Sequence, residues 1–466
     1  MQLTSPLFLF AFLPLSLAPL LVSRPRHRKA IITALSLIWL LFVNRHDPLS
    51  LVPIAAVVAV TCLLSALPDR APRVRLAFGI SLPLAALLAA RLLAEYTPFA
   101  YSYPTGLTMV TLAAISVAID RYRGDAPERE APFAVIAYLI FFPTMLVGPI
   151  LRYKQFLRAT ERISPLSRET IARGALLFMR GYVKRIALAA VLMRAFSDLF
   201  TFGEAALPPL ALLLLLLTAY ALFYAFVTGT TDMARGIMAI LGIQPPRGQS
   251  GSVSLLLPHR VLASTLLPFD RYLEDYVARP LRSKLRGKWG RLLAATLSVF
   301  FTVLLYRTRP EALLLALPLF LCAWLSASRA RTHRFPRHVL ARLAFGTLSS
   351  LAISILVLGI MLGDPFEIFT LALHAFDGSA TYSVYYLFGA IADARYLAPA
   401  LILTALSPLL HYYPILARRL PKRADLTLRC VSTALLLLAF VGAILYFLPQ
   451  FPQYADPAYG TTVFVR

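Results

Sequence analysis

The stretch FFPTMLVGPILRYKQF, residues 141–156, places helix-breaking residues inside an apolar run and then ends in charge. The breakers are Pro143, Gly148 and Pro149, and the polar end is Arg152, Tyr153 and Lys154. Proline lacks the backbone N–H that a helix interior needs, and glycine destabilises a helix interior. The stretch therefore predicts an apolar segment that turns within itself and returns to a polar boundary.

Apolar residues dominate the whole chain. Of 466 residues, 59% are hydrophobic and 15% are charged, whereas soluble domains average about 45–50% apolar and about 25% charged residues. The apolar runs are 6–22, 30–43, 49–67, 76–94, 106–119, 208–227, 312–327, 343–362, 389–410 and 430–448. Because about 20 helical residues cross a bilayer, these runs predict an all-α polytopic membrane bundle of about twelve spans. We expect a single integral domain over residues 1–466.

The net charge of +24 is concentrated in short loops between the apolar runs. The basic loops are 23–29, 68–75, 283–291, 328–342 and 411–429, whereas 1–5, 95–105, 363–388 and 449–465 contain no Lys or Arg. The positive-inside rule makes the first set cytoplasmic and predicts that both termini lie outside. We expect a multi-pass protein of a bacterial inner membrane whose basic loops contact anionic lipids. A nucleic-acid partner is not expected.

Residues 132–150 lie between two segments with cytoplasmic character, 120–130 and 152–162. An apolar segment that enters and leaves by the same face is a re-entrant hairpin. Non-helical backbone at membrane depth is tolerated only inside protein or beside a water-filled cavity. We therefore expect the hairpin to border a pocket or tunnel, and a kinked ordinary span is the alternative.

Two stretches of mixed basic and apolar character, 152–185 and 259–291, are expected to form cytoplasmic interfacial helices. Residues 183–200 are expected to cross the membrane as one tilted helix that contains an arginine. The three cysteines lie in or beside apolar runs without metal-ligand spacing, so no metal site is expected.

Four motifs resemble segments of the membrane-bound O-acyltransferases, in the order found in that family. They are FFPTMLVGPILRYKQF, PTGLTMVTLAAISVAIDRYRG (104–124), GTTDMARGIMAILGI (229–243) and LVLGIMLGDPFEIFTLALHAF (356–376). The third resembles a Gly-Tyr-Ser-Asp-Met-Ala segment, and Asp232 keeps its acid. The chain is similar to the bacterial branch of alginate O-acetyltransferases and teichoic-acid D-alanyl transfer proteins over about residues 76–390.

The resemblance implies a helical bundle around a tunnel that narrows at mid-membrane. An acyl donor would arrive from the cytoplasmic side and an acceptor hydroxyl from outside. The family's presumed general base is a tunnel histidine, which suits a hydroxyl that needs a base poised near neutrality. No tightly bound cofactor is implied, because the donor, of the acyl-carrier or acyl-CoA type, is a substrate.

The family's histidine motif is the point at which this chain departs from the pattern. The turn LLYRTRPEALL places Tyr306 and Arg307 where the family has Trp-His, and no histidine occurs between His259 and His333. Arginine has a pKa above about 12 and cannot act as a base at neutral pH. The base is therefore another residue, or the protein does not catalyse the usual reaction.

The candidate catalytic residues are accordingly His259, His374 and Arg307, of which the last holds the position of the family histidine. The candidate tunnel or substrate-binding residues are Arg152, Tyr153, Asp232 and Tyr306. His259 lies nearest the family's active region in sequence, and His374 lies on an expected outer amphipathic helix.

The resemblance predicts transfer of an acetyl-type acyl group across the membrane to a hydroxyl of a cell-envelope glycan or lipid. One alternative is a catalytically silent relative, a pseudoenzyme, that serves as an assembly subunit or partner. A second is a transporter of a lipid-linked or acyl substrate. The expected partners are membrane lipids, with an acyl carrier or a periplasmic acyltransferase as further candidates.

Overall fold

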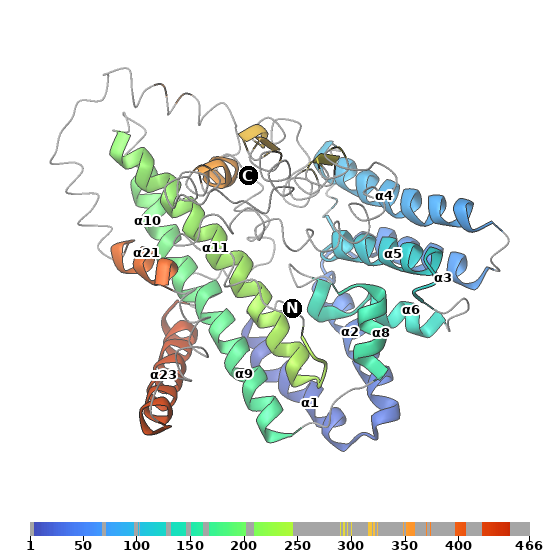
Figure 1. The fold of residues 1–466 in the computed structure, drawn as a ribbon, viewed down its shortest axis with the longest axis horizontal. Helices are drawn as coiled ribbons and strands as arrows, with labels where there is room; N and C mark the ends of the chain where they lie inside the picture. Colours follow the sequence, from blue (N-terminus) through green and yellow to red (C-terminus); the bar gives the residue numbers. More distant parts are fainter. Residues whose placement is uncertain are drawn as a thin grey trace. The chain divides into compact units, whose positions relative to one another are not determined.

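A computed structural model describes most of the N-terminal half of the chain and parts of the C-terminal half. The described residues are 4–67, 71–96, 101, 103–126, 132–145, 151–161, 167–201, 209–245, 351–358, 397–406 and 422–447, with isolated positions between 289 and 373. Within them every regular element is a helix (Figure 1), so the predicted all-α class is confirmed for this part of the chain.

The chain divides into two compact units, residues 1–178 with 230–247, and residues 179–229 with 248–466. The helices that begin in the first unit are α1 (Leu13–Val22), α2 (Pro25–Val43), α3 (Leu51–Ala66), α4 (Pro72–Tyr96), α5 (Leu107–Tyr122), α6 (Pro132–Leu139), α7 (Phe142–Met145), α8 (Tyr153–Glu161) and α9 (Arg168–Val183). The second unit contains α10 (Ala189–Thr201), α21 (Leu397–Leu406), α23 (Lys422–Gly442) and the first part of α11 (Pro209–Ile240). The expectation of one integral domain stays a prediction.

Four helical stretches in the described residues are long and apolar enough to cross a membrane. They are Pro48–Ala66, Pro72–Ala94, Ala211–Ile240 and Asp425–Tyr446, and Phe8–Val22 is a shorter apolar helix. The first two expose many large apolar side chains, as helices that face lipid do, whereas the third is mostly buried. The remaining crossings of the predicted twelve stay a prediction.

The sequence predicts interfacial helices over 152–185 and a membrane-crossing helix over 183–200, but no helix ends where these two ranges meet. Helix α9 continues into α10 through a π-helical turn, η3 (Lys184–Leu188), so the helical run from 168 to 201 is continuous. Within the second unit, the Lys184 amine lies 5.7 Å from the centroid of the Tyr224 ring, and the Arg185 guanidinium 4.1 Å from that of Phe226. Aromatic faces attract cations. These contacts therefore stabilise the two basic residues where α9 and α10 pack against α11, and the helix continues through them.

Glycines allow α9 and α11 to approach closely. In the first unit, a Cβ atom at Gly236 would lie 2.6 Å from the Phe178 backbone nitrogen and 2.7 Å from the Gly174 carbonyl oxygen. In the second unit, a Cβ atom at Gly229 would lie 2.9 Å from the Gly181 carbonyl oxygen. Small residues of this kind are typical where membrane helices cross with their backbones in contact.

Each unit has its own apolar core. In the first unit, Phe142 of α7 packs against three aromatic rings from two other helical segments. The distances between ring centroids are 6.5 Å to Phe8, 5.7 Å to Phe12 and 6.0 Å to Trp39. In the second unit, buried residues of α10 and α11 pack with residues 352–358 and Ala400. The core of the first unit therefore contains Phe142, the second residue of the motif that begins with Phe-Phe-Pro at residue 141.

Candidate functional site

The end of α5 presents two carboxylates on the same side. Gly124 has a φ of 70°, a left-handed conformation that residues with a Cβ adopt only at a cost. Its N–H donates to the Arg121 carbonyl at 3.0 Å, and the Asp125 N–H donates to the Asp120 carbonyl at 2.8 Å. This pair of bonds is a Schellman motif, which ends the helix. The turn brings Asp125 back beside Asp120.

The first N–H groups of α8 are capped by side chains of α5. The Tyr153 N–H donates to Ser116 Oγ at 3.0 Å, and the Lys154 N–H donates to Asp120 Oδ2 at 3.0 Å. Helix N-termini leave backbone N–H groups without intrahelical partners and carry partial positive charge. A buried carboxylate from a neighbouring helix therefore satisfies both the hydrogen bond and the helix dipole.

Gln155 completes the cap from within α8. Its side-chain oxygen accepts from the Arg152 N–H at 3.2 Å, which is the return half of a capping box. Arg152 itself offers no side-chain acceptor, and α5 supplies the acceptors in its place. Arg152 thus occupies the N-cap position through its backbone, and its role as a tunnel or substrate-binding residue stays a prediction.

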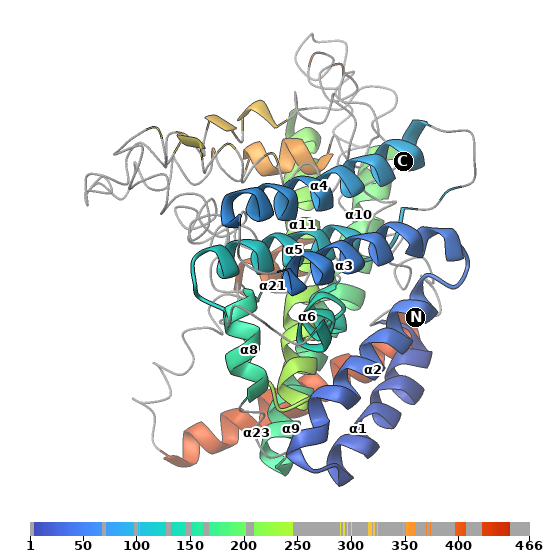
Figure 2. The ribbon, with the colours of Figure 1, turned by 90° about the vertical axis from the view of Figure 1, so that its right-hand side faces the viewer.

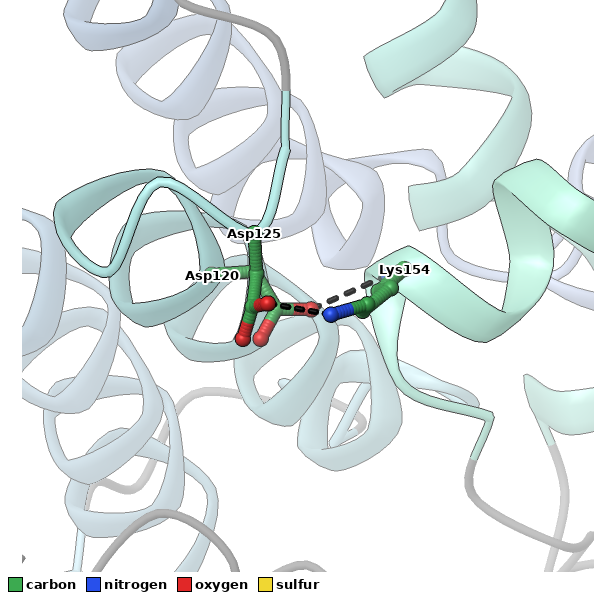
Figure 3. A network of polar contacts seen from close by, with 3 residues as sticks. All are labelled: Asp120, Asp125 and Lys154. Atoms are coloured by element: carbon green, nitrogen blue, oxygen red, sulfur yellow. Dashed lines mark hydrogen bonds and ion pairs between the residues drawn. The ribbon is translucent and has the colours of Figure 1, made fainter.

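An ion pair closes the base of the hairpin. Lys154 Nζ contacts Asp125 Oδ1, and both side chains are partly exposed. Figure 3 shows the carboxylates of Asp120 and Asp125 beside each other, facing Lys154. The chain therefore leaves α5 and enters α8 at the same place, as a hairpin requires. That this place is the cytoplasmic membrane surface stays a prediction.

The hairpin itself runs along α5. Helix α6 ends at Leu139, and the helix interruption at residues 140–141 comes just before Pro143 of the short α7. Pro143 has no backbone N–H and its ring would clash with the carbonyl of Leu139, four residues earlier, so α6 cannot continue through it. At the tip, a Cβ atom at Gly106 would lie 3.5 Å from Met145 Cβ, at the opposite end of α5. The expected turn at Gly148 and Pro149 lies outside the described residues.

Two side-chain contacts hold the hairpin together. The Tyr138 hydroxyl of α6 donates to the Leu151 carbonyl at 2.6 Å, joining the outgoing and returning arms. The Phe142 N–H donates to Ser36 Oγ of α2 at 3.3 Å, which occupies one of the N–H groups at the start of α7. Such contacts satisfy backbone polar groups that a helix break would otherwise leave bare.

Tyr153 carries a polar atom without a partner. Its side chain is 0% exposed and its ring centroid lies 5.1 Å from that of Tyr138. The Tyr153 hydroxyl has no hydrogen-bond partner. Leaving a buried donor unsatisfied costs about 1–3 kcal/mol, so this hydroxyl is available to a water molecule or to a polar atom of a ligand.

Asp232 lies on α11, in the stretch of that helix that belongs to the first unit. It is 1% exposed, and its Oδ1 lies 3.4 Å from Arg235 Nη1. The spacing of three residues places both charges on one side of the helix. A carboxylate buried in a helix of spanning length is costly, and the neighbouring guanidinium offsets part of that cost.

The other predicted site residues, His259, Tyr306, Arg307 and His374, lie outside the described residues. Their roles therefore stay predictions. In the part of the chain that the structure describes, no group of three or more His, Cys, Asp or Glu side chains could hold a metal ion.

The structure adds Ser116, Asp120, Asp125 and Lys154 to the residues that organise this site. The sequence analysis includes Asp120 in the motif 104–124 and Lys154 at the polar end of the motif 141–156, but it assigns neither residue a role. The signal that was available is the pairing of a charged helix end, DRYRGD at 120–125, with a charged helix start at 152–154. Two polar ends around one apolar hairpin must lie close together.

The chain is similar to bacterial proteins named "probable alginate O-acetylase AlgI". It is 31% identical to that of Pseudomonas aeruginosa over 150 residues, which cover 30% of this chain and 26% of the relative. It is 29% identical to that of Pseudomonas syringae pv. tomato over 218 residues (43% and 38%), and 29% identical to that of Azotobacter vinelandii over 145 residues (30% and 28%). No family model matches the chain.

These similarities and the apolar helices support an integral membrane protein related to the O-acyltransferases. The matched stretches span between 26% and 38% of the relatives' own length. The resemblance to the O-acyltransferases is thus supported over part of the chain, through similarity to these relatives. That Tyr306 and Arg307 replace the family's Trp-His pair stays a prediction.

Proposed function

We propose that the protein is a membrane-bound O-acyltransferase that moves an acetyl-type acyl group across the membrane to a hydroxyl of a cell-envelope glycan or lipid. The similarity to alginate O-acetylases carries this proposal. The geometry supports it because the hairpin is held at its base by Asp120, Asp125 and Lys154 and is packed inside protein along α5. Such a broken segment suits the wall of a polar passage.

In this proposal the donor side is the base of the hairpin and the acceptor side is the opposite end of α5. The donor would be an acyl carrier protein or acyl-CoA, and a periplasmic acyltransferase is a candidate downstream partner. The protein would lie in the bacterial inner membrane with both termini outside. Tyr153, whose hydroxyl is buried without a partner, would contact a polar atom of the substrate.

A catalytically silent relative is the second candidate, and one specific observation favours it. The sequence has no histidine between His259 and His333, the region in which the resemblance expects the general base. A silent protein would keep the hairpin and its cap for stability and would act by binding another component of the pathway.

A complementation experiment tests the proposal and separates these candidates. The gene would be deleted in the bacterium that encodes it, and alkali-labile O-acyl esters of envelope glycans and lipids would be measured by mass spectrometry. We expect an ester population to disappear on deletion and to return with the wild-type gene. Esters that persist unchanged in the deletion strain, under conditions in which the wild-type protein is produced, would contradict acyl transfer. If alanine variants of each of the three candidate residues, His259, Arg307 and His374, restored the esters, the catalytically silent relative would be favoured.

A further inference from the structure

The two tyrosines at the base of the hairpin differ in how their hydroxyls are satisfied. The Tyr138 hydroxyl of α6 donates to the Leu151 carbonyl at 2.6 Å. The Tyr153 hydroxyl of α8 has no hydrogen-bond partner among the described residues, although its ring centroid lies only 5.1 Å from that of Tyr138. Both helices lie beside α5 in Figure 2, and both side chains are buried. One of two neighbouring buried hydroxyls is therefore unused by the fold.

The unused hydroxyl makes the fold less stable than a plain ring would. A buried donor without an acceptor has lost its hydrogen bonds to water and gains none in the protein. A phenylalanine ring at position 153 would pack against Tyr138 in the same way and would avoid that loss. A buried polar atom of this kind calls for an explanation other than packing, such as a water molecule or a bound ligand.

The charges next to Tyr153 favour a neutral acceptor. The following residue, Lys154, donates its backbone N–H to the carboxylate of Asp120, which is 3% exposed, and its amine pairs with Asp125. An anionic ligand at the Tyr153 hydroxyl would lie close to these two carboxylates. Charges of the same sign repel strongly where little water screens them. A neutral acceptor avoids this repulsion.

A carbonyl oxygen is the neutral acceptor that suits this place. The neighbouring Tyr138 hydroxyl already meets a carbonyl, that of Leu151. The rings of Tyr138 and Phe156, with centroids 5.2 Å apart, provide an apolar surface for the rest of a ligand. In the proposed function the base of the hairpin is the donor side, and the acyl donor is a thioester with one carbonyl oxygen on its acyl carbon. A hydroxyl that holds this oxygen would orient the acyl group.

We propose that the Tyr153 hydroxyl donates a hydrogen bond to the carbonyl oxygen of the acyl thioester that serves as donor. This inference rests on the proposed acyl transfer and adds the atom that Tyr153 recognises. Tyr153 is 0% exposed, so the acyl group would reach the hydroxyl by displacing the neighbouring rings. The bond would then form where bulk water is excluded, and a hydrogen bond is stronger in such a place.

A pair of small probes tests the recognition of the carbonyl. They are S-acetyl-N-acetylcysteamine and S-ethyl-N-acetylcysteamine, in which a methylene replaces the thioester carbonyl and the rest is the same. Their affinities for the purified full-length protein are measured from the rise in unfolding temperature with probe concentration. We expect the wild type to bind the acetyl probe about tenfold more tightly than the ethyl probe, the equivalent of one hydrogen bond. Tyr153→Phe should bind the two probes equally.

Tyr138→Phe is the matched control, because it removes a hydroxyl that already has an acceptor in the protein. It should keep the preference for the acetyl probe. Without probe, it should unfold at a lower temperature than the wild type, because the Leu151 carbonyl loses its donor. Tyr153→Phe should unfold at the same temperature as the wild type or at a higher one, because it removes no bond within the protein.

Three results would overturn the proposal. They are the same affinity of the wild type for both probes, a preference for the acetyl probe that survives in Tyr153→Phe, and a loss of stability in Tyr153→Phe as large as that in Tyr138→Phe. The last result would show that the hydroxyl holds a structural partner such as a water molecule.

The complementation experiment separates a failure of this inference from a failure of the proposed function. Esters that depend on the gene, together with a preference that survives in Tyr153→Phe, would overturn only the role of Tyr153. A preference that Tyr153→Phe abolishes, together with esters that persist in the deletion strain, would support a thioester site and contradict acyl transfer to the envelope.

Discussion

The backbone N–H of Lys154 donates to Oδ2 of Asp120 at 3.0 Å, although the two residues are 34 positions apart in the chain. Asp120 belongs to α5 and Lys154 to the first turn of α8, so this bond fixes where the hairpin between them begins and ends. Asp120 is 3% exposed, and its carboxylate lies at the positive end of the α8 dipole. We therefore expect the backbone cap to anchor the hairpin more strongly than the partly exposed ion pair of Asp125 and Lys154 does.

The first prediction is that Asp120 dominates the stability of this anchor. Asp120→Ala leaves the Lys154 N–H buried without an acceptor and should cost about 1–2 kcal/mol of unfolding free energy, as loss of a helix cap does. Asp120→Asn keeps an oxygen acceptor and should cost less. Thermal unfolding in detergent, followed by circular dichroism, measures both. Equal unfolding temperatures for Asp120→Ala and the wild type would contradict the cap.

The second prediction concerns the neighbouring carboxylate. The pair formed by Asp125 and Lys154 is about one third exposed on each side, and such surface pairs contribute about 0–1 kcal/mol. Asp125→Asn should therefore lower the unfolding temperature less than Asp120→Ala does, in the same assay. The effect should shrink further at high salt, because ions screen exposed charges. A larger loss for Asp125→Asn would show that the ion pair, and not the cap, holds the hairpin.

The hairpin shows what the sequence could predict. Pro143 and the charged end at Arg152 indicated a broken apolar segment that returns to a polar boundary, and the structure has a helix interruption just before Pro143 and a capped helix start at Arg152. The sequence could not assign the caps to Ser116 and Asp120. Capping by another helix depends on which helices pack together, and that arrangement is set by the tertiary fold.

The third prediction tests the close approach of α9 and α11 in the first unit. A methyl group at Gly236 would meet the backbone of Phe178 at 2.6 Å, and overpacking of this kind typically costs about 1–3 kcal/mol. Gly236→Ala should therefore lower the unfolding temperature. Gly442→Ala is the matched control, because nothing lies within 4 Å of its added Cβ and alanine is the better helix former by about 1 kcal/mol. Similar shifts in the two variants would show that close packing at Gly236 is unimportant.

Helix α11 shows where the sequence was less informative. The apolar run ends at 227, yet the helix continues to Ile240 through Thr228 and Asp232. Thr228 Oγ1 donates to the Tyr224 carbonyl at 2.7 Å within the same helix, which satisfies a polar side chain without ending the helix. Hydropathy detects where apolar residues stop, but it does not detect that buried polar residues have local partners.

The fourth prediction is the membrane orientation. Single cysteines in loops 328–342 and 411–429 should be labelled by a membrane-impermeant thiol reagent only after the inner membrane is opened, because these loops are basic and expected to be cytoplasmic. A cysteine in 363–388, which has no Lys or Arg, should be labelled in intact cells with a permeable outer membrane. The background is a variant that lacks the three native cysteines. Labelling of either basic loop in cells with an intact inner membrane would contradict the predicted topology.

The last prediction concerns Arg307, which holds the position of the family's histidine according to the resemblance. Arg307 cannot abstract a proton at neutral pH, but its guanidinium can stabilise negative charge that develops on the acyl oxygen. Removing a preorganised donor of this kind typically costs about 10²–10³ in rate. We therefore expect Arg307→Ala to abolish the envelope esters in the complementation assay, and Arg309→Ala, two residues further along the chain, to preserve them. Arg307→Lys keeps the charge without the planar pair of donors and should retain a small fraction of the esters. If Arg307→Ala restores the esters as fully as Arg309→Ala does, then Arg307 takes no part in catalysis. A loss of esters can come from lost catalysis or from lost stability, and thermal unfolding of the same variants separates the two. Removing a purely structural arginine would lower the unfolding temperature together with the amount of esters.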